Sequence, residues 1–161
     1  MYPHPALKKV CREIPAIDQD IRALVSNLLD TMRTAPGSVG VAAPQIGVTF
    51  RVCVVDVSQH RLGKEQNHGQ LVMINPILLS GTGAAVMREG CMSVPDYTGD
   101  VQRYTEIEVA YLDESGEKLT LRTEGFEAVA VQHEMDHLDG VLFLDRIVSL
   151  KTGLFRRKAY K

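Results

Sequence analysis

Residues 132–137, with the sequence QHEMDH, constrain the fold more than any other part of this chain. They contain an HExxH pattern, and residues four apart on a helix lie one turn above each other. His133 and His137 can therefore offer two imidazoles to a single metal ion. Glu134 is rotated by roughly a quarter turn from His133, since a helix has ~3.6 residues per turn. Its carboxylate can reach an open coordination position without being a ligand.

A helix over about residues 125–139, ended by Gly140, should carry this motif. Phe126, Val129 and Ala130 share a face with the two histidines at helical spacing. The alternative is a pair of surface histidines beside acidic residues. The apolar neighbours argue against it, because a buried unpaired imidazole is costly, whereas a metal ion would satisfy it.

A catalytic metal with two histidine ligands needs a third protein ligand. After the motif the sequence contains no histidine or glutamate, so Asp139 and Asp145 are the only downstream candidates. Upstream, residues 89–95 (EGCMSVP) place Cys91 in an irregular strand marked by a glycine and a proline. A Cys91 thiolate would complete a two-histidine, one-cysteine site with a fourth position open for water. Taken alone, a cysteine of this kind is more often a buried spectator.

The other segments predict a single α+β domain over residues 1–161. Residues 18–34 have the apolar spacing of an amphipathic helix, with Asp18 as its N-cap. A last helix is expected from about Ser149. Strands are expected at 51–57, 71–80, 105–112 and 118–122, the last two as a hairpin. We expect antiparallel or mixed sheets around the central metal-binding helix, with an N-terminal and a C-terminal helix.

Composition excludes several classes of protein. The net charge of −2 argues against general nucleic-acid binding, DNA included. No stretch approaches the ~20 apolar residues that span a bilayer, and the start has no targeting pattern, so we expect a cytoplasmic protein without membrane partners. Three widely spaced cysteines do not suggest a disulfide framework, and Cys11 and Cys53 are expected to be buried apolar residues.

Along nearly its whole length the chain resembles the peptide deformylase family of bacterial type. It carries the three signature segments of that family in order: residues 38–45 (SVGVAAPQ), 89–93 (EGCMS) and 132–137 (QHEMDH). HExxH alone occurs in several unrelated folds, whereas all three segments in this order are specific. Ser38 stands where the first signature usually begins with glycine, which affects the expected loop conformation rather than the chemistry.

The resemblance implies a hydrolase that removes the formyl group from the N-terminal N-formylmethionine of newly synthesised polypeptides and releases formate. Cys91, His133 and His137 match the metal ligands of the family. Glu134 matches the general base and acid that assists a metal-bound water in attacking the formyl carbon. The family implies one Fe²⁺ per chain, with Zn²⁺ as a readily bound substitute that thiolate and imidazole ligands also suit.

The resemblance also implies roles in substrate binding. Gln45 and the backbone N–H of Met92 match the donors to the developing oxyanion. Gly40 and Val39 would hydrogen-bond to the substrate backbone or flank it. Candidates to line the methionine side-chain pocket are Met87, Phe126, Val129 and Ala130.

Two further expectations concern the surroundings of the site and its partners. Arg103 and Asp136 could orient the ligand histidines, although Asp136 could equally be a solvated surface acid. The expected partners are N-formylmethionyl nascent peptides and the ribosome near the exit tunnel. A basic C-terminus would dock on ribosomal RNA, unless it is only a solvated helix end. Its members are Lys151, Arg156, Arg157, Lys158 and Lys161.

Two other functions compete with this interpretation. A zinc peptidase that cleaves internal peptide bonds would need its third ligand downstream of HExxH, where the chain offers little. A structural metal site in a binding module would be closed by four protein ligands. The sequence provides three good candidates, together with an acid positioned for catalysis.

Overall fold

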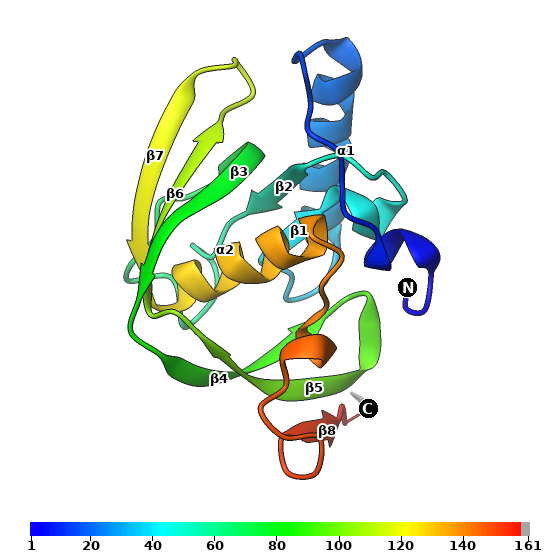
Figure 1. The fold of residues 1–161 in the computed structure, drawn as a ribbon, viewed down its shortest axis with the longest axis vertical. Coiled ribbons are helices and arrows are strands. Elements are labelled where there is room, and N and C mark those ends of the chain that lie inside the picture. The colour runs from blue at the N-terminus through cyan, green and yellow to red at the C-terminus, as the bar shows by residue number, and fades with distance from the viewer. Residues whose placement is uncertain (159–161) are drawn as a thin grey trace.

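The two long helices form where the sequence predicts them, in a computed structural model that describes residues 1–158 (Figure 1). Helix α1 spans Gln19–Thr34, and the Asp18 carboxylate caps it by accepting the N–H of Ile21 at 3.0 Å. Helix α2 spans Gly125–Leu138. Gly140 follows it with φ of 72°, a left-handed conformation that glycine adopts without strain and that ends the helix.

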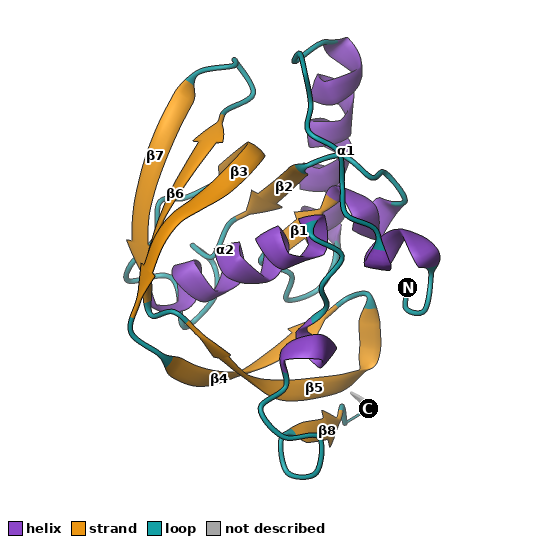
Figure 2. Cartoon of the chain, in the orientation of Figure 1, coloured by secondary structure: helices purple, strands orange, loops and turns teal. Residues whose placement is uncertain are grey.

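The strands form two antiparallel sheets (Figure 2). The larger sheet has the order β1-β2-β3-β6-β7 and the smaller sheet the order β4-β5-β8. The larger sheet consists of β1 (Gly40–Ala42), β2 (Val52–Val55), β3 (Leu71–Thr82), β6 (Glu106–Leu112) and β7 (Lys118–Glu124). The smaller sheet consists of β4 (Ala85–Cys91), β5 (Val94–Arg103) and β8 (Leu154–Arg156). Short 3₁₀ helices are η1 (Pro5–Lys8), η2 (Ala43–Ile46) and η3 (Phe143–Arg146).

Helix α2 runs through the middle of the molecule, with the larger sheet on one side and the smaller sheet on another (Figure 1). Ala128 and Val131 of α2 pack with Cys53 and Val109 of the larger sheet in one core cluster. Most of α2 is buried, including Glu127 and Gln132, so it lacks the single apolar stripe that the sequence suggested. A polar group in such a helix needs a partner inside the protein, because water does not reach it.

Two further clusters complete the core. Leu28 of α1 packs with Val41, Val54 and Ile74, which covers the other face of β1, β2 and β3. A smaller cluster that includes Phe143 joins the smaller sheet to η1 and η3. Cys11 and Cys53 are buried free cysteines, as predicted.

The prediction of a C-terminal helix from about Ser149 is wrong for the described residues. Leu154–Arg156 form strand β8, which pairs with β5 through the partners Phe155 and Thr98. The ring of Phe155 also lies under the Arg88 guanidinium, 3.5 Å from its carbon to the ring centroid. Pairing and packing by these few residues therefore outweigh helix propensity. The predicted basic residue Lys161 lies outside the described residues.

No helix within residues 1–158 is both long enough and apolar enough to cross a membrane.

Candidate metal centre

Cys91, His133 and His137 converge at one point between the smaller sheet and α2. One potential donor atom from each lies within 4.8 Å of the others, and all three side chains are buried. Cys91 Sγ and His137 Nε2 are 3.4 Å apart. In the part of the chain that the structure describes, this group has three members, the number expected of a catalytic rather than a closed structural metal site.

The end of strand β4 brings the cysteine to the helix. Cys91 is the last residue of β4, and the register shifts between Gly90, which pairs with Thr98, and Cys91, which pairs with Val94. The chain therefore turns back within two residues. Since alternate residues of a strand face the same side, Glu89 shares with Cys91 the buried side that faces α2.

Glu89 is the residue that orients His133, a role that was not predicted from the sequence. Its carboxylate lies 2.8 Å from His133 Nδ1 and receives two hydrogen bonds from Arg103, at 2.6 and 2.9 Å. Burial raises the pKa of Glu89, but its hydrogen bonds with His133 and Arg103 outweigh this effect and hold the pKa below its usual value. A carboxylate on Nδ1 fixes the ring so that Nε2 is left for an ion. The sequence signal for this role was an acid two residues before the candidate ligand Cys91, on the same face of a strand.

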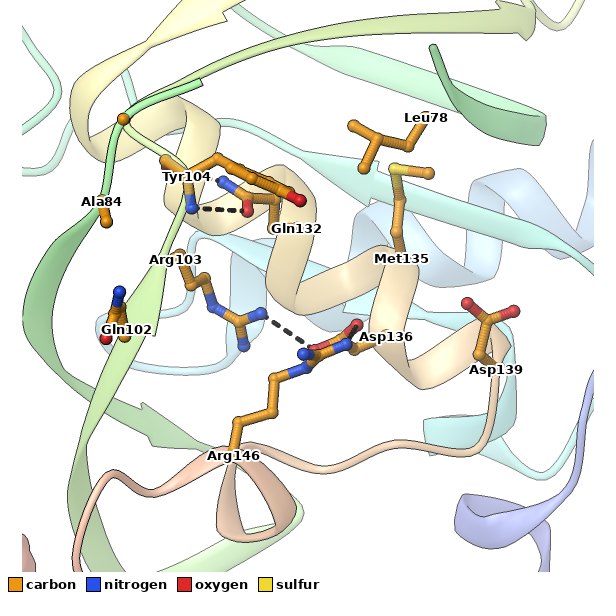
Figure 3. A pocket seen from close by; sticks show the side chains of 11 residues that line it. Leu78, Ala84, Gln102, Arg103, Tyr104, Gln132, Met135, Asp136, Asp139 and Arg146 are labelled. Carbon is orange, nitrogen blue, oxygen red and sulfur yellow. Dashed lines mark hydrogen bonds and ion pairs between the residues drawn. The ribbon is translucent and has the colours of Figure 1, made fainter. Parts of the chain in front are cut away.

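Arg103 therefore acts on the histidine through Glu89, not directly. On its other side Arg103 donates to Asp136 at 2.9 Å, and Asp136 also accepts from Arg146 (Figure 3). Asp136 is buried, so the alternative that it is a solvated surface acid is wrong. It supports the arginine rather than a metal ligand.

Glu134 follows His133 in α2 and is buried, and its Oε2 has no hydrogen-bond partner within residues 1–158. Burial raises the pKa of Glu134 to about 7, against the opposing effects of His133 and Arg103. A carboxyl group with a pKa near 7 is well matched to proton transfer at neutral pH. Burial has the opposite effect on His137 and lowers its pKa to about 3. Burial also opposes a charge on His133, but hydrogen bonds with Cys91 and Glu89 raise the pKa of that histidine well above its usual value.

The side chain of Gln45, in η2, contacts Cys91. Its Nε2 donates to Cys91 Sγ at 3.3 Å and to Ser93 Oγ at 3.0 Å, while its Oε1 accepts the N–H of Ala42 at 2.9 Å. This fixed amide directs its N–H groups toward Cys91 and Ser93. Met92 lies in the turn between β4 and β5, so its N–H is outside both strands.

Strand β1 forms the edge of the larger sheet beside Glu134. Gly40 has no room for a side chain, because a Cβ would lie 2.8 Å from both Cγ and Oε1 of Glu134. The carbonyl of Val39 accepts the N–H of Asp56 at 2.9 Å, on the side of β2. Ala42 instead donates to Gln45, on the free side. Since backbone directions alternate along a strand, the polar groups of Gly40 also face the free side.

The four predicted pocket residues lie on β4 and α2, the two elements that carry the candidate ligands. Val129 and Ala130 are buried in α2, Phe126 is half-buried two turns before His133, and Met87 is half-buried in β4. A pocket of about 380 Å³ lies elsewhere, around Leu78, Tyr104 and Met135 (Figure 3). It lies on another face of α2 and none of the three donor residues lines it, so it is not the predicted methionine pocket.

The downstream acids that a peptidase would need as ligands are engaged elsewhere. Asp139 is paired with Arg51 at 3.0 Å. Asp145 is paired with Lys8 and accepts the N–H of Leu142 at 2.9 Å at the start of η3. Neither belongs to the group of converging donors, so the structure favours Cys91 as the third ligand.

Comparison with known proteins gives a consistent result. Residues 1–153 match the family described as polypeptide deformylase. The peptide deformylase of Thermodesulfovibrio yellowstonii is 41% identical over 157 residues, which cover 98% of this chain and 92% of that protein. The peptide deformylase of Phenylobacterium zucineum is 43% identical over 162 residues, which cover 100% and 93%.

Solved structures show the same similarity in three dimensions. A peptide deformylase from Synechococcus elongatus, in complex with actinonin, has a TM-score of 0.83 at 35% identity and covers 92% of this chain and 77% of its own. The peptide deformylase of Thermotoga maritima has a TM-score of 0.82 at 33% identity, and the alignment covers 92% of this chain and 95% of that one.

Proposed function

The chain belongs to the polypeptide deformylase family, and on this basis we propose that it removes the formyl group from the N-terminal N-formylmethionine of newly synthesised polypeptides. The reaction hydrolyses a linear amide bond and releases formate, in one domain spanning residues 1–161. The observation that carries the proposal is the convergence of Cys91, His133 and His137 beside the buried Glu134.

Cys91, His133 and His137 would hold one divalent cation, for which the family resemblance favours Fe²⁺, with Zn²⁺ as a substitute. Three buried donors within 4.8 Å, next to a carboxylate oxygen without a partner, fit such an ion. When bound, the cation lowers the pKa of a water molecule toward about 7 and so supplies a nucleophile at neutral pH.

Glu134 would move the protons of the reaction. Its carboxylate takes a proton as the water attacks the formyl carbon and then delivers it to the departing α-amine, a role typically worth about 10²–10⁴-fold in rate. An N–H of Gln45 and the backbone N–H of Met92 would stabilise the charge on the tetrahedral oxygen. Loss of one such donor commonly costs about 10²–10³ in rate.

The free edge of β1 offers a route for the peptide. An extended substrate could pair with the backbone of Gly40 as an added strand, which binds any sequence through main-chain hydrogen bonds. Val39 would contribute through its side chain, since its carbonyl is already bonded to Asp56. The first side chain would then enter the space between β4 and α2 bounded by Met87, Phe126, Val129 and Ala130.

Formate release tests this function directly. Anaerobically prepared, iron-loaded protein should release formate from a formyl-Met peptide, and should leave an acetyl-Met control and internal peptide bonds intact. Removal of the metal by a chelator should abolish the activity, and Fe²⁺ should restore it. Cleavage of internal bonds without formate release would support a metallopeptidase instead.

We also propose that the basic C-terminus docks on the ribosome close to emerging chains. Lys151, Arg156, Arg157 and Lys158 are exposed, although in and around strand β8 rather than on a helix. Binding through phosphates would depend steeply on salt and little on RNA sequence.

Truncation after Leu150 would be a poor test of docking, because it removes β8 from the smaller sheet. The variant Arg156→Glu/Lys158→Glu leaves Phe155 in place and should reduce co-sedimentation with ribosomes at low salt. Turnover of a short free formyl-peptide should be unchanged. Lys9→Glu/Arg22→Glu, at exposed positions outside the smaller sheet, makes the same change in net charge and should leave co-sedimentation unaffected. Unchanged co-sedimentation of the first variant would contradict docking.

A further inference from the structure

The segment that connects β2 with β3, residues 56–70 (the β2–β3 loop), is held against the first turns of α2. Gln66 Nε2 donates to the Glu124 carboxylate. The backbone N–H of His68 donates to Glu127 at 2.6 Å, and its ring also contacts that carboxylate. Glu127 is fully buried and accepts a third bond from Thr123 at 2.8 Å. The loop is therefore fixed at the end of the helix where the methionine pocket is proposed.

A third contact involves Phe126, one of the residues proposed to line the methionine pocket. The ring of His60 stacks on Phe126, with centroids 4.4 Å apart and planes 26° from parallel. Phe126 lies on the same face of α2 as Val129 and His133. One face of the phenylalanine ring is therefore covered by the loop, which restricts the rotation of this half-buried side chain.

His60 is itself held in place. The backbone N–H of His60 donates to the carbonyl of Val57 at 3.0 Å. The backbone carbonyl of His60 accepts the N–H groups of Gly63 and Lys64, both at 2.9 Å. Its ring Nδ1 accepts the N–H of Leu62 at 3.1 Å. An Nδ1 that accepts a hydrogen bond belongs to a neutral imidazole with its proton on Nε2. Burial, followed by Arg61, lowers the pKa of His60, which is consistent with this neutral form.

We propose that His60 is a positioning residue for substrate specificity. It holds the Phe126 ring as the end wall of the pocket that receives the first side chain of the substrate. This inference rests on the proposed deformylase function. A fixed aromatic wall suits a methionine thioether, because sulfur makes favourable contacts with aromatic rings and a straight side chain can lie against it. Without the histidine, Phe126 would gain rotational freedom, and the preference for methionine over a small side chain should fall.

The test compares formyl-Met-Ala with formyl-Ala-Ala. The ratio of their kcat/KM values should fall about threefold to tenfold in His60→Ala, the range expected for the loss of an aromatic pair. The change should lie mainly in KM for the methionine substrate, with kcat nearly unchanged. His60→Phe should restore the ratio because it restores the stack, whereas His60→Gln should not. Gln59→Ala, an exposed neighbour in the same loop, is the matched control.

A double-mutant cycle separates positioning from loop stability. In a Phe126→Ala background, His60→Ala should cause no further loss of selectivity. An unchanged ratio in an active His60→Ala enzyme, or failure of His60→Phe to restore it, would overturn this inference alone. Absence of formate release by wild-type enzyme from either peptide would overturn the proposed function and this inference with it.

Discussion

Gly40 illustrates how much a single residue contributes to this site. Its lack of a side chain lets edge strand β1 lie directly against Glu134, with no space left for a Cβ. The same position presents backbone groups on the free side of the strand. The signature segment 38–45 therefore requires this glycine for close approach rather than for an unusual backbone angle.

Gly40→Ala should consequently impair catalysis more than folding. The methyl group would meet the Glu134 side chain at 2.8 Å and displace the carboxylate or the strand. We expect kcat/KM to fall by at least about tenfold, since small misplacements of catalytic groups are costly. Metal content should be unchanged, because none of the three ligands is touched. Ser26→Ala, on the exposed face of α1, is the control and should retain activity. Equal activity of the two variants would show that the close approach is unimportant.

At the scale of elements, the buried cluster of Glu89, Arg103 and Asp136 connects β4, β5 and α2. Arg103 donates to both acids. The strand that carries Cys91 and the helix that carries the histidines are therefore joined through one arginine side chain. Removing one partner of a buried pair leaves an uncompensated charge, which typically costs about 3–5 kcal/mol.

Arg103→Met should therefore lower the free energy of unfolding by roughly 3–5 kcal/mol. Chemical denaturation of the metal-free protein measures this without a contribution from the ion. Arg122→Met removes an exposed arginine near Glu106 and Glu108, and it should change stability by less than about 1 kcal/mol. Similar losses in the two variants would argue against a special role of the buried cluster.

The sequence predicted elements well where a local pattern decides them. Asp18 and the apolar spacing after it predicted α1, and Gly140 marked the end of α2. It predicted β8 wrongly, because three residues become a strand only when β5 offers them an edge. It also left most of β4 and β5 unassigned, since their polar residues, such as Arg103, are satisfied by partners distant in sequence.

The residues of the candidate site were also predictable only where a local sequence pattern places them. Spacing alone placed His133 and His137 on one helix face, and their convergence with Cys91 is confirmed. The contribution of Glu89 could not be predicted from spacing, because it depends on the register of β4 against β5. The contact between His60 and Phe126 required the path of a loop that no periodic pattern describes.

For the molecule as a whole, the metal should act as a cross-link between the two sheets. Cys91 belongs to the smaller sheet, whereas the histidines belong to the helix that covers the larger one. An ion that binds only the folded state stabilises it by RT ln(1 + [M]/Kd), about 2.7 kcal/mol at a hundred times Kd.

Thermal unfolding should show this effect. The Tm of the metal-free protein should rise by several degrees when Zn²⁺ is added. The shift in Tm is roughly ΔΔG divided by the entropy of unfolding, which is set by the size of the domain. His137→Ala lacks one ligand and should show little or no increase. An equal increase in both proteins would indicate that the ion binds elsewhere.

The most direct test of the central claim is formate release by Glu134→Gln at full metal occupancy. Metal binding is assigned to Cys91, His133 and His137, and proton transfer to Glu134 alone. The variant should bind one Fe²⁺ per chain, as the wild type should, and should bind a formyl-Met peptide. Its rate of formate release should be lower by at least about 10²-fold. Near-normal turnover with one metal ion bound would contradict the assignment of proton transfer to Glu134.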